Sequence, residues 1–119
     1  MKLIRIGFWK SGSEPSWPSP ASFVDPSWDA NERELVEGYL RDGMVVRTWM
    51  GPSFCRVCGQ AVGTKDLSDG VYLWPEGLAH YVAVHSVRLP SSFVEHMNTR
   101  LDELDSLAVD DEWWKQQGS

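Results

Sequence analysis

Two short stretches decide how this chain folds: Cys55-Arg56-Val57-Cys58-Gly59 and, further on, Gly77-Leu78-Ala79-His80-Tyr81-Val82-Ala83-Val84-His85. They hold both cysteines and two of the three histidines of the chain, in the pattern C-x2-C-x21-H-x4-H. Thiolates and imidazoles are ligands that a tetrahedral zinc ion prefers. A C-x2-C turn lets two sulfur atoms converge on one ion, and a glycine permits the tight backbone that follows. The pattern therefore predicts a Zn²⁺ site formed by Cys55, Cys58, His80 and His85.

The predicted ion is structural. Four strong protein ligands complete a tetrahedral site and leave no position for a reactive water molecule. We therefore name no catalytic residue. The alternative, a zinc-dependent hydrolase, would need one ligand to leave and Glu76 to act as a base. The chain also lacks the nucleophile elbow G-x-S-x-G and the phosphate-binding loops G-x4-G-K-S/T and G-x-G-x-x-G.

Three other interpretations of these four residues are open. The cysteines could form a disulfide, which a reducing cytosol disfavours. They could form a thioredoxin-type redox pair, but that motif opens a helix in a βαβ unit, whereas a hairpin follows here. The histidines could also be unrelated to the cysteines. We expect a cytoplasmic protein, because the first ten residues lack the apolar core and cleavage site of a signal peptide.

The elements next to the predicted site are a hairpin and a helix. Residues 60–74 read as two strands joined by an Asp69-Gly70 turn, the strongest short hairpin signal. Pro75 suits the first turn of a helix that ends at His85. Strand, strand and helix around one ion make a ββα-like module, with a spacer too long for a free DNA-binding finger, so the module is embedded in a larger domain.

The remaining segments complete a small domain. Asp29 and Glu32 predict a capped helix over 29–42, and Ser92 and Glu95 predict a second capping box that begins a third helix. Alternating or β-branched residues predict strands over 2–9 and 44–50. The sequence therefore favours a single α+β domain over residues 1–119. It would have a small antiparallel sheet, two or three helices, a proline-rich loop near 11–26 and a flexible acidic tail from about 108.

Composition and charge narrow the function. The chain has 119 residues, 42% of them hydrophobic and 24% charged, which fits one globular domain. It contains no apolar run of membrane-spanning length, so we expect no membrane partner. The net charge is −6, of which −5 falls in residues 102–119, and this disfavours nucleic-acid binding through general basicity. Local clustering of Arg56, Lys65 and Arg88 near the metal leaves a nucleic-acid-binding zinc module as a further alternative.

The favoured function is a non-enzymatic, zinc-stabilised module that binds an unknown protein partner. The acidic tail, with Trp113 and Trp114 near its end, is a second motive for this interpretation beside the closed ligand set. We name Arg56, Trp74 and Arg88 as residues that would contact a partner. Seven tryptophans in so short a chain fit either core filling or an aromatic binding surface.

The stretch from Asp25 to Pro90 resembles a family of short bacterial proteins. The resemblance lies in the C-x2-C turn, in Ser68-Asp69-Gly70-Val71-Tyr72, in Trp74-Pro75-Glu76-Gly77-Leu78-Ala79-His80-Tyr81-Val82 and in His85-Ser86-Val87-Arg88-Leu89-Pro90. No activity is assigned to that family. The resemblance therefore implies a bacterial origin and a metal site and says nothing about an activity.

Overall fold

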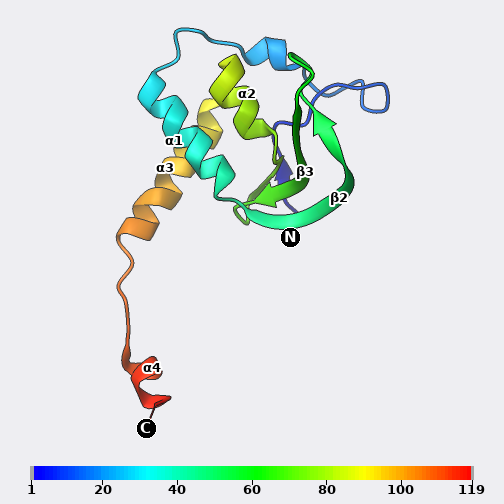
Figure 1. Cartoon of the computed structure of the whole chain (residues 1–119). Coiled ribbons are helices and arrows are strands. Elements are labelled where there is room, and N and C mark those ends of the chain that lie inside the picture. The colour runs from blue at the N-terminus through cyan, green and yellow to red at the C-terminus, as the bar shows by residue number, and fades with distance from the viewer. Residues whose placement is uncertain (1, 119) are drawn as a thin grey trace.

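In the computed structural model, which describes residues 2–118, the chain forms an α+β fold, as predicted (Figure 1). Among these residues there are four strands, four α-helices and one 3-10 helix. Their bounds are β1 Ile4–Arg5, η1 Pro20–Phe23, α1 Ala30–Arg41, β2 Met44–Phe54, β3 Ala61–Ser68, β4 Tyr72–Pro75, α2 Leu78–His85, α3 Ser91–Asp105 and α4 Glu112–Gln116. None of these helices is long and apolar enough to cross a membrane.

The four strands form one sheet in the order β1-β4-β3-β2. The pairs β2–β3 and β3–β4 are antiparallel, and the second of them is the predicted hairpin. β1 runs parallel to β4, with Ile4 opposite Tyr72, so the sheet is mixed and not wholly antiparallel. The amino-terminal strand is also shorter than the predicted 2–9, because the chain leaves the sheet after Ile6 and places Trp9 in the core.

The helix ends test the capping predictions. Asp29 caps α1, and its carboxylate accepts the N–H of Glu32 at 2.9 Å, as predicted. The residue that caps α3 is Pro90, with no side-chain hydrogen bond, so the predicted capping box of Ser92 and Glu95 is wrong. Ser92 already lies inside the first turn, where its hydroxyl cannot take the place of a cap.

α2 also begins later than predicted. Pro75 is the last residue of β4, opposite Asp66, and does not start the helix. The next residue still follows the strand, because the N–H of Glu76 donates to the carbonyl of Lys65 at 2.8 Å. The helix then runs from Leu78 to His85. It ends where predicted and begins three residues later than predicted.

The core lies between the sheet and the helices α1, α2 and α3, which Figure 1 shows gathered beside it. Three tryptophans are buried there: Trp9, Trp28 and Trp74. The indole N–H of Trp74 donates to the carbonyl of Leu40 at 3.0 Å, which joins β4 to the end of α1. Core filling therefore explains some of the tryptophans, while Trp49, Trp113 and Trp114 are exposed.

The proline-rich segment packs on the body. Phe23 in η1 lies against Trp9, with ring centroids 5.9 Å apart, and the N–H of Asp25 donates to the carbonyl of Ser86 at 2.9 Å. The end of the chain behaves differently. Figure 1 shows the segment after α3 leading α4 away from the body, and every described residue from Asp102 onward is exposed. The flexibility of this tail stays a prediction.

Candidate metal centre

The four predicted ligands come together in the structure. Cys55 follows β2, Cys58 lies in the turn between β2 and β3, and both histidines lie on α2. One ligand atom from each of Cys55, Cys58, His80 and His85 lies within 4.8 Å of the others. The sulfur of Cys58 and the Nε2 of His80 are 3.4 Å apart. The sequence prediction that these residues form one group is therefore confirmed.

The turn that carries the cysteines is shaped by its backbone. The N–H of Gly59 donates to the carbonyl of Cys55, and the N–H of Cys55 donates to the carbonyl of Gln60, both at 2.8 Å. Gly59 has a φ of +75°, a conformation that other residues adopt at a cost. The N–H of Val57 points at the sulfur of Cys55 at 3.4 Å. This arrangement turns both sulfur atoms toward the same side.

Tyr81 ties this turn to α2, a contact that the sequence analysis missed. Its hydroxyl accepts the N–H of Arg56 at 2.8 Å, and its ring packs edge-on against Trp9 with centroids 5.5 Å apart. Only 4% of Tyr81 is exposed. A buried tyrosine needs a hydrogen-bond partner for its hydroxyl. The position of Tyr81 next to His80 in the sequence was the signal from which its contact with the cysteine turn could have been predicted.

The protonation states of two ligands suit a metal ion. Burial opposes a thiolate at Cys55, but hydrogen bonds from the N–H groups of Cys58 and Val57 outweigh it and lower the pKa of Cys55. Burial, followed by the nearby charges of His85 and Arg41, lowers the pKa of His80. Both shifts run toward the forms that bind metals, a thiolate and a neutral imidazole.

The spacing of the four atoms matches a single ion closely. With bonds of 2.0–2.3 Å, a tetrahedral zinc ion holds its ligand atoms roughly 3.3–3.8 Å apart. The 3.4 Å between Cys58 and His80 lies within that range, and the 4.8 Å limit of the whole group exceeds it by about 1 Å. A bound ion would have to draw the most widely spaced of the four atoms together by about 1 Å.

Glu76, which the hydrolase alternative would use as a base, is already engaged. Its carboxylate accepts the N–H of Thr64 at 2.9 Å and lies against Gly63, so it joins the start of α2 to β3. Glu76 therefore has a structural role: it holds β3 against the segment that leads into α2.

The three residues predicted to contact a partner have different places. Arg56 is exposed, between the two cysteines. Trp74 is wholly buried, at 0% exposure, so it belongs to the core and offers no surface to a partner, contrary to its prediction as a contact residue. Arg88 is exposed, but its guanidinium pairs with Asp25 at 2.9 Å and fastens the proline-rich segment to the loop after α2.

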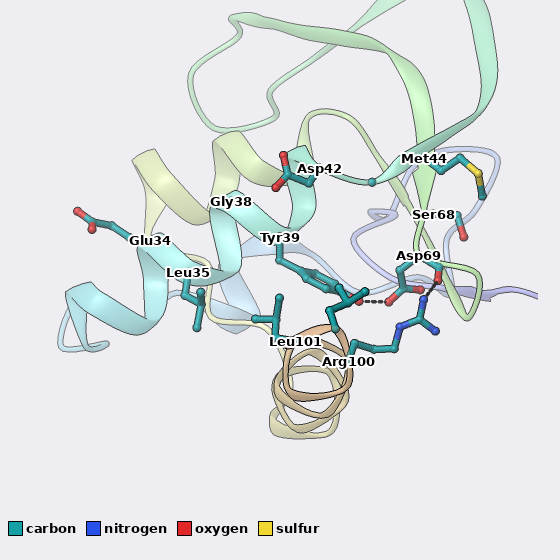
Figure 2. Close-up of a pocket in the computed structure, with 12 residues that line it drawn as sticks. Glu34, Leu35, Gly38, Tyr39, Asp42, Met44, Ser68, Asp69, Arg100 and Leu101 are labelled. Carbon is teal, nitrogen blue, oxygen red and sulfur yellow. Dashed lines mark hydrogen bonds between the residues drawn. The ribbon is translucent and has the colours of Figure 1, made fainter. Parts of the chain in front are cut away.

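A second polar cluster lies at the turn between β3 and β4 (Figure 2). The carboxylate of Asp69 accepts the hydroxyl of Tyr39 and pairs with the Nε2 of His96 at 2.7 Å, while Arg100 donates to the Asp69 carbonyl at 2.7 Å. Burial would raise the pKa of Asp69, but the hydrogen bonds from Tyr39, from the N–H groups of Tyr72 and Val71 and from His96 lower it to about 2.

The sequence analysis missed this cluster. Its members come from α1, the β3–β4 turn and α3, and Asp69 was interpreted only as a turn residue. The side chains of Tyr39, Asp69 and Arg100 line a hollow of about 520 Å³ beside the end of α3. Burial, followed by the hydrogen bond to Asp69, raises the pKa of Tyr39, so its hydroxyl stays protonated as a donor.

Comparison with known proteins gives no match to a family model, to a curated protein or to a solved structure.

Proposed function

We propose that the chain is a small zinc-binding protein in which Cys55, Cys58, His80 and His85 hold one structural Zn²⁺, and that the module stabilised in this way binds a partner protein in the cytoplasm. The observation that carries the proposal is the convergence of two sulfur and two imidazole ligands within 4.8 Å. Such a set of two soft and two borderline donors is typical of structural zinc.

A buried nitrogen supports a resident ion. The Nε2 of His85 is buried and has no hydrogen-bond partner among residues 2–118. Burying a polar nitrogen without a partner costs on the order of 1–3 kcal/mol, so folded proteins rarely leave one unpaired. A metal ion held between the C-x2-C turn and α2 would give the imidazoles there a binding partner.

The ion would stabilise the folded domain. It would bind the turn after β2 to both ends of α2, and its binding free energy would add to the folding free energy. The turn needs this help because five of its six residues, 56 to 60, are exposed and only Cys55 is buried. A small domain with a long irregular segment gains most from such a cross-link.

Partner binding is supported by the exposed strand at the edge of the sheet. All eleven residues of β2 are exposed, and several of them are large and apolar, including Val45, Trp49 and Phe54. Exposed strands with apolar side chains are typical interaction sites in soluble proteins.

The test is the metal content of the purified full chain, with the ligands assigned by substitution. We expect one zinc ion per chain, and a cobalt-loaded protein with the absorption of a tetrahedral site bearing thiolates. Cys55→Ser and His80→Asn should each lower the metal affinity at least tenfold (about 1.4 kcal/mol). The matched control is His96→Asn, which changes the third histidine outside the group and should keep one ion per chain. A metal content unchanged by Cys55→Ser and His80→Asn would reject the proposal.

A further inference from the structure

Three arginines line one hollow on the face of the sheet next to the amino-terminal loop. The hollow has a volume of about 840 Å³, and Arg5, Arg47 and Arg56 reach it from β1, from β2 and from the cysteine turn. None of the three forms an ion pair or a side-chain hydrogen bond with any of residues 2–118. Guanidinium groups gathered without partners are a site for an anionic ligand.

The other four arginines differ from these three. Arg33 donates to the hydroxyl of Ser86, Arg100 donates to the carbonyl of Asp69, and the remaining two, Arg41 and Arg88, pair with carboxylates. All four therefore serve the fold. Among residues 2–118, the arginines without an ion pair or side-chain hydrogen bond are the three that share the hollow.

Aromatic rings hold two of these guanidinium groups. The guanidinium carbon of Arg5 lies 4.7 Å from the ring centroid of Phe8 and 5.7 Å from that of Trp17, and Arg47 lies over Trp49 at 5.1 Å. Stacking of this kind orients the planar group and leaves its N–H edges available. Trp49 is half exposed, so the hollow also presents an aromatic surface to a ligand.

Two carboxylates lie in the same lining. Asp66 is buried, and its carboxylate accepts the indole N–H of Trp49 at 3.2 Å. Glu14 belongs to the amino-terminal loop, and the lining as a whole keeps an excess of one positive charge. That excess stands out in a chain of net charge −6. A ligand that fits has carboxylates for the arginines and an aromatic group for the exposed rings.

The chain contains a segment with this chemistry. Asp110, Asp111 and Glu112 directly precede Trp113 and Trp114, whose side chains are 68% and 72% exposed. We infer that the hollow binds the acidic, aromatic tail of a second copy of the chain. The inference deepens the proposed function, because it names the protein partner of the module.

A second copy fits better than the tail of the same chain. The hollow is lined by the amino-terminal loop, the cysteine turn, all four strands and α2, with no residue from α1 or α3. The tail leaves the body at the end of α3, which borders the other hollow of Figure 2, and Figure 1 shows it leading away from β2. A nucleic acid is disfavoured by the net negative charge of the chain.

The metal centre and the hollow share the cysteine turn, since Cys55 and Arg56 also line the hollow. Arg56 lies between the ligands Cys55 and Cys58, whereas Arg5 and Arg47 lie outside that turn. The two proposals can therefore fail separately. Metal content reports on the zinc site, and a substitution at Arg47 in fully metal-loaded protein reports on the docking of the tail.

The experiment is sedimentation of the full, metal-loaded chain over a range of concentrations. We expect reversible self-association that weakens at about 0.5 M salt, because exposed charges carry part of it. Arg47→Glu should weaken the association at least tenfold, as should the double variant Trp113→Ser with Trp114→Ser. Arg41→Glu, the matched control on α1, changes the net charge equally and should leave the association constant unchanged within twofold. A peptide of residues 106–118 should compete and return the chain to monomers.

Each contrary result overturns the inference. A chain that stays monomeric at all concentrations and does not bind the peptide has no such docking. Association that survives the loss of both tail tryptophans uses another surface, such as the edge of β2. A change in tryptophan fluorescence that depends on Arg47 but not on concentration would place the tail on its own body. Binding of a single-stranded oligonucleotide without binding of the peptide would assign the hollow to nucleic acid.

Discussion

The two turns at the ends of β3 meet the same requirement in opposite ways. Each turn must be fastened to helices that pack against the sheet. At the end of β3, Asp69 does this with hydrogen bonds to Tyr39 on α1 and His96 on α3. At its start, the turn of Cys55 and Cys58 faces two histidines of α2, and a buried nitrogen of one of them has no partner in the described part of the chain.

The difference shows which cluster is complete. Both oxygens of the Asp69 carboxylate accept hydrogen bonds, so nothing further is required there. In the Cys55–Cys58–His80–His85 group, by contrast, the buried Nε2 of His85 has no hydrogen-bond partner among residues 2–118. A buried polar cluster without enough partners in the chain is the place where a protein takes them from an ion.

The largest effect should come from removing the ion. If the proposed ion is bound, stripping the full chain with a strong chelator should lower its free energy of unfolding by several kcal/mol, because an ion held by these four side chains would bind the folded state alone. The cooperative thermal transition should shift strongly downward and return when zinc is added. The Asp69 cluster gives the contrast, since His96→Asn protein should respond to the chelator in the same way as wild type. A thermal transition that the chelator does not move would remove the distinction between the two turns.

A smaller, pH-dependent effect is expected at Asp69. Its pKa falls from an ordinary value of 3.8 to about 2 in the folded chain, and its side chain is only 8% exposed. A lowered folded pKa gives stability that is present above about pH 4 and is lost as the pH falls toward 2, about 2 kcal/mol in all.

The measurement is the difference in unfolding free energy between wild type and Asp69→Asn, taken from denaturant titrations between about pH 5 and pH 2. The difference should shrink as the pH falls. The contribution of the ion cancels, because acid releases it from both proteins alike. Asp102→Asn, at an exposed position on α3, is the control for the chemical change. A difference that is constant over this range would contradict the hydrogen-bonded carboxylate described above.

The smallest effect is expected when one glycine of each turn is replaced by alanine. Gly59 has a φ of +75° and Gly70 a φ of +93°, and an added methyl group would meet no atom within 4 Å at either position. Alanine should therefore cost only the backbone strain, about 1 kcal/mol at each site. Competition with a chelator dye should show a lowered metal affinity for Gly59→Ala alone. Equal metal affinities in the two variants would mean that the backbone of the cysteine turn does not position the ligands.

The sequence was sufficient to predict the group of two cysteines and two histidines because these residue types carry their own chemistry. Cys55, Cys58, His80 and His85 belong to scarce residue types, and their spacing constrains the turn and the helix at once. The α1 cap at Asp29 and the Asp69-Gly70 hairpin were also predictable, since each depends on neighbours a few residues away.

What the sequence did not reveal depends on contacts between distant segments. Asp69 meets Tyr39 and His96 from positions 30 and 27 residues away, and no local pattern marks such a cluster. β1 pairs in parallel with β4, a strand far along the chain. Pro75 continues β4 because tertiary pairing with Asp66 overrides its preference for a helix start.

The parallel pairing of β1 with β4 bears on how the protein is made. The ribosome releases the amino end first, yet Ile4 and Arg5 find their neighbour only when Tyr72 and Leu73 have been translated. Ile4 and Arg5 are therefore among the last residues of the domain to find their place, and they complete the sheet at its edge. A fusion partner placed before Ile4 must leave β1 free to pair with β4 after the rest of the sheet has formed.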